Sequence, residues 1–329
     1  MTRRELVIEA IRANPLAKNK QLARHLAKKH PDQFRDVEQA RDMIRYYKGK
    51  CGTKNRDALM HREFLHAPQL HNAKILLFDL ETAPLQTYMW SKWQKGVNDD
   101  AIISDWFILT WSGKWLFDDK VISHRCTADE VSKQNDQRIV KQLWQAFDEA
   151  DIIIAHNLQK FDEKKSNTRF LFHQLPPPSP YLTIDTLLHA RKRFAITSNR
   201  LDYIAKFMGI EGKMDTPKGL WWRAMKGDDD ALEQMRVYCD QDVKVLEDVY
   251  LFLRPYIKPH PNLGLFIEQD RQCCPSCGHD ELELLQKDYT TFVNSYTAHR
   301  CKSCGSISRS RVTNTPIKTK RQLTTSIPK

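Results

Sequence analysis

Short apolar runs of strand length alternate with helical segments through the middle of the chain, and this alternation limits the possible folds more than any other feature. The runs KILLFDLET, WFILTWSGKWLF and DIIIAHN lie within residues 74–157, and helical patterns cover 136–149 and 229–253. Strands that alternate with helices are typical of an α/β domain with a central sheet flanked by helices. We therefore expect such a domain over residues 73–256.

The segment before this domain has a different pattern and predicts a small helical domain over residues 1–50. Apolar residues recur there at helical spacing in three segments, Arg3–Ala13, Asn19–Lys29 and Val37–Lys48. Asp36 is suited to cap the third. Many Lys and Arg residues remain for the surface, so we expect a basic helix-turn-helix-like domain that binds nucleic acid. The alternative is a charged interaction or oligomerisation module. Residues 51–72 show no sustained period and are predicted to be a linker.

Basic ends flank an acidic middle in this chain of 329 residues. Residues 1–56 hold 15 Lys and Arg against 6 Asp and Glu, and residues 306–329 hold 6 against none, within a net charge of +11. This distribution favours a protein that binds a polyanion; the alternative is two solvated basic ends without a partner. No apolar run approaches the roughly 18–20 residues that cross a bilayer, and the start lacks the apolar core of a signal peptide. We expect no membrane association and a cytoplasmic location.

Two acids interrupt the first apolar run. Asp79 and Glu81 are two residues apart, and side chains at this spacing point to the same face of a strand. Two buried carboxylates on one face repel each other and are costly to desolvate, so a bound cation would explain them. The alternative is an edge strand whose acids lie in water.

Two further acids occupy positions that suit a metal site. Asp162 follows the turn after the third apolar run, where α/β folds tend to place their sites. Tyr238 and Asp242 are four residues apart in the long helical pattern and therefore share a face. Each of these signals is weak alone, and their order along the chain gives them weight.

The ordered set resembles the DnaQ-like, or DEDD, exonuclease family. LLFDLET is similar to its first motif, IIAHNLQKFD to its second and YCDQD to its third, whose Y-x-x-x-D form is that of the tyrosine branch. PPPSPYLTIDTLLHARKRF and SNRLDYIAKFMGI, with Lys213 behind them, resemble phage-encoded and related bacterial members. The resemblance covers roughly residues 73–255 and implies a ribonuclease-H-like fold with a central mixed sheet. The chain departs from proofreading domains in the polar residues that follow Asp162.

The resemblance implies a metal-dependent 3′–5′ exonuclease of a bacterial cell or a phage. Four acids, Asp79, Glu81, Asp162 and Asp242, would hold two Mg²⁺ or Mn²⁺ ions for phosphodiester hydrolysis. Tyr238 would orient or deprotonate the attacking water, unless it is a core residue. His156, Asn157 and Asp185 are candidates for substrate contact or for support of the metal ligands, and the sequence favours a helix-capping role for Asp185.

Two C-x-x-C pairs near the end of the chain predict a zinc ribbon over residues 272–308. The pairs are Cys274 with Cys277 and Cys301 with Cys304, and 23 residues separate the inner cysteines. Four thiolates form a closed tetrahedral site that suits one structural Zn²⁺. Cys273 leaves the register slightly ambiguous. We expect a linker over 257–271 before the ribbon and a flexible basic tail over 309–329 after it.

Three functions stay open from the sequence. We prefer an exonuclease acting on DNA, with single-stranded DNA or DNA 3′ ends and possible replication proteins as partners, in replication, recombination or repair. An exoribonuclease would use the same residues, and a DNA-binding adaptor would use the fold as a scaffold. Five tryptophans could stack on bases, although such residues more often lie in the core: Trp106, Trp111, Trp115, Trp221 and Trp222.

Overall fold

The computed structural model describes residues 3–13, 19–48, 71–210, 218–268 and 271–326. Two compact units divide the chain, residues 1–67 and residues 68–329, and each is treated by itself. Most of the predicted linker 51–72 and Lys213 lie outside the described residues. Among the described helices, none is long and apolar enough to cross a membrane.

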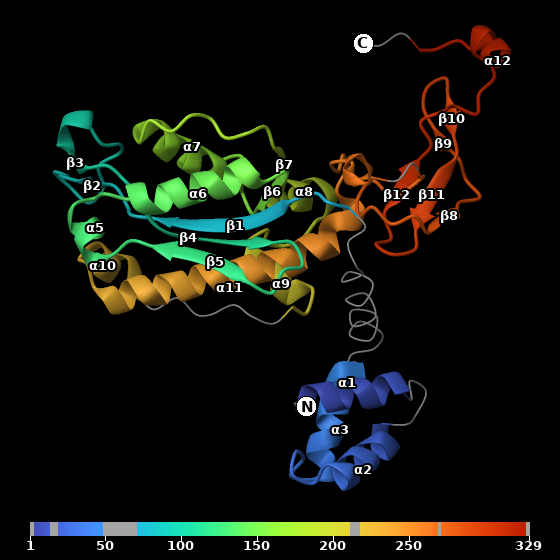
Figure 1. Cartoon of the computed structure of the whole chain (residues 1–329), viewed down its shortest axis with the longest axis horizontal. Helices are drawn as coiled ribbons and strands as arrows, with labels where there is room; N and C mark the ends of the chain where they lie inside the picture. The colour runs from blue at the N-terminus through green and yellow to red at the C-terminus, as the bar shows by residue number, and fades with distance from the viewer. Residues whose placement is uncertain (1–2, 14–18, 49–70, 211–217, 269–270, 327–329) are drawn as a thin grey trace. The chain divides into compact units, whose positions relative to one another are not determined.

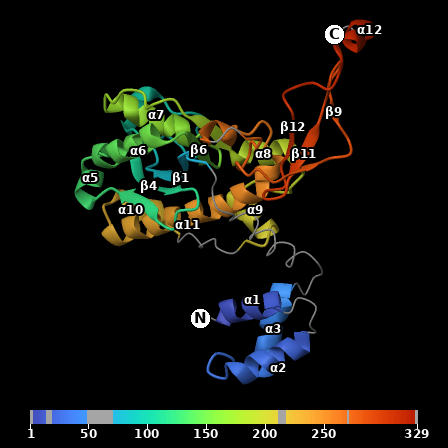
Figure 2. The same cartoon turned by 45° about the vertical axis from the view of Figure 1, so that its right-hand side comes forward.

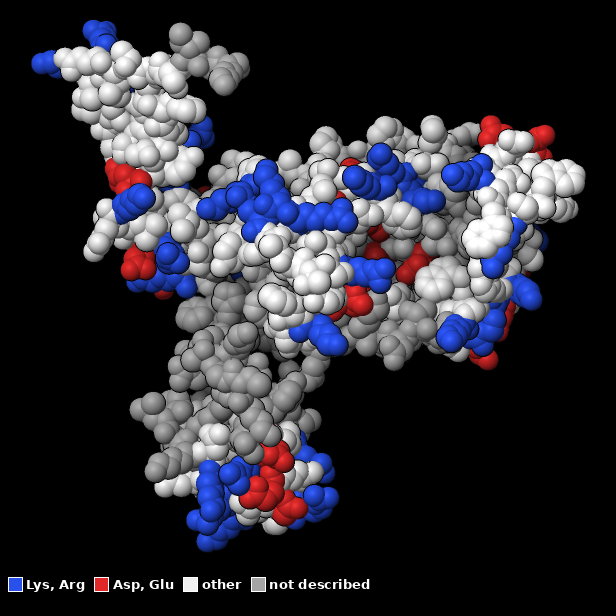
Figure 3. All heavy atoms as spheres, turned by 180° about the vertical axis from the view of Figure 1, so that it is seen from behind, with Lys and Arg blue, Asp and Glu red and all other residues white. Residues whose placement is uncertain are grey.

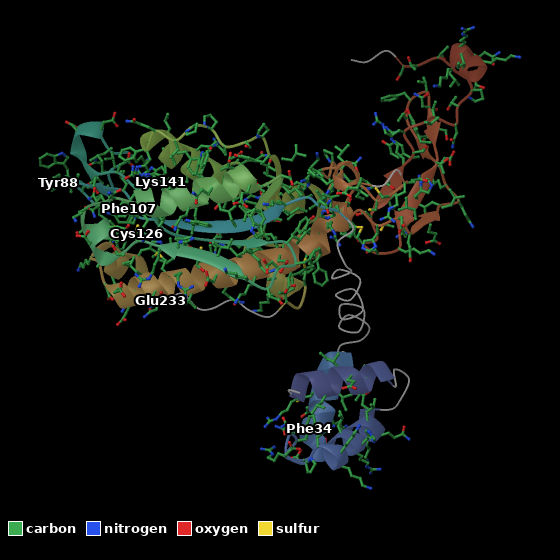
Figure 4. The ribbon with its side chains drawn as sticks, in the orientation of Figure 1. Phe34, Tyr88, Phe107, Cys126, Lys141 and Glu233 are labelled. Carbon is green, nitrogen blue, oxygen red and sulfur yellow. The ribbon has the colours of Figure 1, made fainter. Side chains whose placement is uncertain are left out.

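Three helices form the N-terminal unit (Figure 1), and they have the bounds that the sequence predicts: α1 (Arg3–Ala13), α2 (Asn19–Lys29) and α3 (Val37–Lys48). Their buried faces share a core of Leu6, Val7, Leu22, Ala23, Leu26, Phe34, Ala40 and Ile44. Phe34, labelled in Figure 4, joins this core from the loop before α3, outside any helical period. Asp36 caps α3 as predicted, because its Oδ1 accepts a 2.7 Å hydrogen bond from the Gln39 N–H.

A mixed five-stranded sheet in the order β5-β4-β1-β6-β7 forms the centre of the second unit (Figure 1). Its strands are β1 (Ile75–Thr82), β4 (Ile108–Trp115), β5 (Val121–Arg125), β6 (Ile152–Ala155) and β7 (Leu182–Asp185). Strand β1 pairs antiparallel with β4 and parallel with β6, so it lies in the middle of the sheet. The predicted α/β class with a mixed central sheet is confirmed.

Helices cover both faces of this sheet. Figures 1 and 2 show α6 and α7 over one face and the long α11 along the other. The helices of this region are α5 (Ala128–Ser132), α6 (Gln137–Glu149), α7 (Asp162–Phe172), α8 (Thr186–Arg193), α9 (Leu201–Phe207), α10 (Leu220–Met225) and α11 (Asp229–Leu253). Helix α11 has the predicted bounds.

The side-chain alternation along β1 decides which face carries the acids. Leu76, Phe78 and Leu80 lie in the main core, where the Phe78 ring meets the Phe147 ring of α6 edge-on at 4.9 Å between centroids. The intervening side chains, which include Asp79 and Glu81, point to the opposite face, against which α11 packs. The acids therefore face the helix that carries Tyr238 and Asp242.

A hairpin that the sequence does not predict follows β1. Strand β2 (Gln86–Thr87) pairs antiparallel with β3 (Ile102–Ser104), and a 3₁₀ turn at Asp99–Ala101 precedes β3. The Thr87 hydroxyl donates a 2.9 Å hydrogen bond to the Ala101 carbonyl and helps to close the hairpin. Paired strands of only two or three residues are too short to leave a period-2 pattern in the sequence.

The cysteine-rich region contains β8 (Leu282–Leu284), β9 (Tyr289–Thr290), β10 (Ser295–Tyr296), β11 (Ala298–Cys301) and β12 (Ile307–Arg309). β12, β11 and β8 form one antiparallel sheet, and β9 and β10 form a separate hairpin. The predicted basic tail over 309–329 contains a short helix, and its flexibility stays a prediction. The Asn314 N–H donates to the Ser295 carbonyl at 2.7 Å, and α12 spans Ile317–Gln322.

The predicted linker 257–271 also has more structure than a free spacer. It follows a 3₁₀ turn at Arg254–Tyr256 and contains another at Leu263–Phe266. Ile257 and Leu263 are buried. The buried residues lie at irregular intervals in the sequence, so no periodic pattern predicts their packing.

Candidate active site

Asp79 and Glu81 lie on β1 opposite β4 and close to α11. Asp79 is opposite Ser112 and Glu81 is opposite Thr110 in the antiparallel register. The Cys239 thiol of α11 lies 3.4 Å from Asp79 Oδ2 and 3.3 Å from the Asp79 carbonyl oxygen, and it donates to them. The contact places one turn of α11 directly against the acidic face of β1.

Asp162, the first residue of α7, has a strongly perturbed carboxyl group. Asp162 is only 3% exposed, and this burial raises the pKa of its carboxyl well above the usual range. The negative charges of Asp79, Asp185 and Glu81 raise the pKa further. Acids from β1, β7 and α7 therefore share one electrostatic environment.

Asp185 ends β7 and ties the neighbouring turn in place. One oxygen accepts hydrogen bonds from the backbone N–H groups of Leu188 (3.2 Å) and Asn157 (3.1 Å), and the other accepts from that of Gln159 (3.2 Å). The predicted cap of α8 is thus present. Asn157 has a φ of +82°, a left-handed conformation that asparagine tolerates better than most residues. The carboxylate of Asp185 and the tight turn together set where Asp162 begins α7.

His156 is held inside the same turn. Its Nδ1 lies 2.9 Å from the Thr186 hydroxyl, and its Nε2 donates to the Asn199 carbonyl at 2.8 Å. Burial lowers the pKa of the imidazole, which favours the neutral ring. These contacts give His156 a role in orienting the turn between β6 and α7.

Tyr238 and Asp242 lie on α11 beside the residue that contacts Asp79. Both are partly buried, and Asp242 follows Cys239 by three residues, which places the two on neighbouring positions of one helix face. The intervening acid, Asp240, is engaged elsewhere: it forms a 2.5 Å ion pair with Arg236 and accepts a 2.6 Å hydrogen bond from Ser112. Of the two aspartates in YCDQD, only Asp242 continues the helix face of Cys239.

Two residues of this site escaped the sequence analysis. Cys239 contacts Asp79 but looks like an ordinary core cysteine, and Ser112 lies within an apolar run as a small polar residue. Their roles depend on the β1–β4 register and on the packing of α11. No local sequence motif predicts such contacts between distant segments.

Of the candidate stacking tryptophans, two line a pocket at the end of β1. The pocket has a volume of about 370 Å³ and is lined by Thr82, Pro84, Gly219, Leu220, Trp221 and Trp222. Trp222 is 63% exposed, whereas Trp111 is buried and donates its indole N–H to the Ile139 carbonyl at 2.8 Å. The ammonium group of Lys165 lies 3.4 Å from the centroid of the Trp106 ring.

Figure 3 shows Asp and Glu atoms in a hollow of this domain, with Lys and Arg atoms around it.

The four predicted cysteines form a compact cluster. Cys274 and Cys304 lie 3.6 Å apart between their sulfurs, and Cys277 and Cys301 lie 3.5 Å apart. All four sulfurs are within 4.8 Å of one another and all four residues are buried. Zn–S bonds of about 2.3 Å in a tetrahedron place sulfurs about 3.8 Å apart, so the cluster fits zinc.

The carboxylates differ from the thiols in the kind of metal site that they would form. In the part of the chain that the structure describes, the cysteines are the one group of three or more possible ligands that all lie within 4.8 Å. A pair of cations about 4 Å apart needs ligands distributed over a larger volume. The chemistry of the acid set fits divalent cations, because hard oxygen ligands suit Mg²⁺ and because buried like charges need compensation.

A family model matches part of the central domain. Residues 108–253 match the model RNase_H_2, described as RNase_H superfamily, a range that includes Asp162, Tyr238 and Asp242 and begins after β1. No curated protein matches the chain. Among solved structures, the chain is similar to the family B DNA polymerase from the hyperthermophilic archaeon Pyrobaculum calidifontis, with 15% identity and a TM-score of 0.40 over 57% of this chain. The match spans 25% of that polymerase chain. The central sheet, its helices and the matched model identify a ribonuclease-H-like domain.

Proposed function

We propose that this protein is a metal-dependent 3′–5′ exonuclease that hydrolyses nucleic acid and prefers DNA, in replication, recombination or repair. The observation that carries the proposal is the buried Asp162, whose carboxyl pKa is raised by burial and by three neighbouring acids. Carboxyl groups with strongly perturbed pKa values that lie close together are typical of catalytic and metal-binding sites. The ribonuclease-H-like domain supports a nuclease activity. The 3′–5′ direction and the preference for DNA are part of the proposal.

Asp79, Glu81, Asp162 and Asp242 would hold two divalent cations, Mg²⁺ or Mn²⁺. When bound, such a pair supplies an activated water and stabilises the negative charge on the leaving 3′ oxygen. Asp79 suits a ligand shared by both cations, because it neighbours Asp162 electrostatically and touches α11 through Cys239. Glu81 and Asp242 would complete the ligands of one cation, and Asp162 would support the other.

Tyr238 would orient the attacking water or accept its proton. It lies one helical turn before Asp242, so its phenol and the proposed ligand share a face of α11. A free tyrosine phenol has a pKa of about 10. Cations at this site would lower the pKa of this phenol or of a nearby water. His156, Asn157 and Asp185 would act indirectly, by fixing the turn that presents Asp162.

Preference for DNA is supported by the N-terminal unit. Its three helices resemble a small DNA-binding domain, and exposed basic residues include Arg3, Lys20, Arg24, Lys28 and Lys29. Zinc bound by the four cysteines would stabilise a second module for nucleic-acid or protein contact. An exoribonuclease is the second candidate, because the same acids can act on RNA. A non-catalytic DNA-binding adaptor is a third.

A time course with 5′-labelled substrates tests the proposal. The wild-type protein and Asp79→Ala are incubated with single-stranded DNA, duplex DNA and RNA of the same sequence, in Mg²⁺, in Mn²⁺ or without divalent cations. We expect a ladder that shortens from the 3′ end of DNA, only with metal and only in the wild type. Faster shortening of RNA selects the exoribonuclease, and binding without cleavage in any cation selects the adaptor.

A further inference from the structure

The β2–β3 hairpin exposes large aromatic side chains. Trp90 is 99% exposed, Trp93 84% and Tyr88 74%, and Ile103 on the paired strand is 53% exposed. Figure 4 labels Tyr88 at the outer edge of the hairpin, directed away from the sheet. Scattered apolar residues are common on surfaces, but several large aromatic residues on one short hairpin indicate a binding surface.

The hairpin continues the strand that carries the acids. Tyr88 follows Glu81 by seven positions, and a fully extended segment of this length spans at most about 25 Å. Thr82 and Pro84 in this segment line the pocket that also contains Trp221 and Trp222. A nucleic acid strand that ends at the acids could therefore extend along the pocket to the hairpin.

The charges near the aromatic residues favour a nucleic acid over an apolar partner. Lys92 lies between Trp90 and Trp93, Lys95 follows Trp93 by two residues, and both are exposed; the Lys92 ammonium lies 5.4 Å from the centroid of the Trp93 ring. The acids Asp99 and Asp100 lie in the turn before β3, where the carbonyl of the adjoining Ala101 accepts a 2.9 Å hydrogen bond from the Tyr88 N–H. In Figure 3, this end of the domain lies at the right and shows Asp and Glu atoms at its upper edge, with Lys and Arg atoms beside uncharged side chains below them. Aromatic faces for bases next to ammonium groups for phosphates are the features that bind single strands.

We propose that the β2–β3 hairpin is a stacking platform for unpaired bases upstream of the 3′ end that reaches the acids. The inference rests on the proposed function for the position of the 3′ end. Bases stack on Trp90 and Trp93, and Lys92 and Lys95 contact the adjoining phosphates. The hairpin thereby selects single strands over duplexes, whose bases are already stacked on one another.

Binding measurements with the full-length chain test this platform. Fluorescence anisotropy in Ca²⁺ gives the Kd of a labelled single strand of about 12 nucleotides, a length typical of such sites, and of a dinucleotide. The test variant is Trp90→Ala/Trp93→Ala, and Phe207→Ala, which removes an aromatic ring 68% exposed on α9, is the control. We expect the Kd of the long strand to rise roughly tenfold or more in the test variant only, with the dinucleotide unaffected.

A small substrate separates this inference from the proposed function. The p-nitrophenyl ester of thymidine 5′-monophosphate occupies only the acids, so its turnover should be equal in the test variant and the wild type. If the wild type turns over neither this ester nor DNA, the exonuclease proposal fails while the binding comparison still decides the platform. An unchanged Kd for the long strand overturns the platform. A changed oligomeric state with unchanged DNA affinity also overturns it and assigns the hairpin to a protein interface.

Discussion

The cysteine cluster and the carboxylate site are two candidate metal centres assembled in different ways. The four cysteines come from two short segments, and their sulfurs all lie within 4.8 Å. The carboxylates come from β1, α7 and α11, and Asp79 and Asp242 are separated by most of the central domain in sequence. The first centre is determined by local spacing and the second by tertiary packing. We therefore expect loss of metal to unfold the first and to leave the carboxylates of the second repelling one another without compensation.

Removing one ligand from the cysteine cluster should have the largest effect. Zinc contributes about 10–16 kcal/mol to the folding of small modules that it organises, so Cys274→Ser should lose zinc and leave the ribbon unfolded. Cys273→Ser is the matched control, because its residue is adjacent in sequence and outside the cluster. Zinc content by mass spectrometry and proteolysis of residues 272–308 measure the outcome. A Cys274→Ser protein that retains one zinc per chain would contradict the four-cysteine assignment.

Removing one hydroxyl from the acid site should reduce catalysis without affecting the fold. A group that transfers or orients a proton contributes roughly 10²–10⁴-fold, so Tyr238→Phe should lower kcat by that factor at an unchanged melting temperature. Tyr256→Phe, which alters a 55% exposed tyrosine after α11, is the control. The rates are measured on the preferred oligonucleotide in Mg²⁺. Equal rates in Tyr238→Phe and wild type would make Tyr238 a packing residue, as the alternative from the sequence holds.

Neutralising Asp162 should stabilise the metal-free protein while it abolishes cleavage. An uncompensated buried polar group costs roughly 1–3 kcal/mol, and Asn at this position removes the charge and can donate to the neighbouring carboxylates. Urea unfolding in metal-free buffer should therefore show Asp162→Asn to be more stable than wild type by that amount. Asp230→Asn, an exposed acid at the start of α11, should show no gain.

The raised pKa of Asp162 also predicts how the stability of the wild type changes with pH. The folded-state pKa of Asp162 is raised above its unfolded value of about 3.9, so the native state binds this proton more tightly. The stability that the group contributes is present below the unfolded pKa and is lost as pH rises through the folded pKa. Asp162→Asn should lack this decline. A variant with the same pH profile as the wild type would contradict the raised pKa of the buried Asp162 carboxyl.

The same contrast explains what the sequence could predict. The cysteine spacing names all four thiols, and the period of the apolar residues predicts α11 and the helices of the N-terminal unit with their bounds. The alternation along β1 correctly places Asp79 and Glu81 on one face. The contact between Cys239 and Asp79 depends on how a helix packs across a sheet, so residues nearby in sequence carry no sign of it. The exposed hairpin was missed for a related reason, because its strands are too short to show a period.

Thiol reactivity should distinguish the two centres with the smallest effect on function. Burial, followed by the charges of Asp79 and Glu81, raises the pKa of the Cys239 thiol well above its usual range, so little of the reactive thiolate forms. Iodoacetamide should therefore label Cys239 at least about tenfold more slowly in the native protein than in urea, by the thiolate argument, with activity retained throughout. The ribbon thiols should be protected only until zinc is chelated, and Cys239 should stay unlabelled after chelation. Peptide mass spectrometry measures both rates, and fast labelling of native Cys239 would show that α11 opens away from β1 and does not hold the acids in one site.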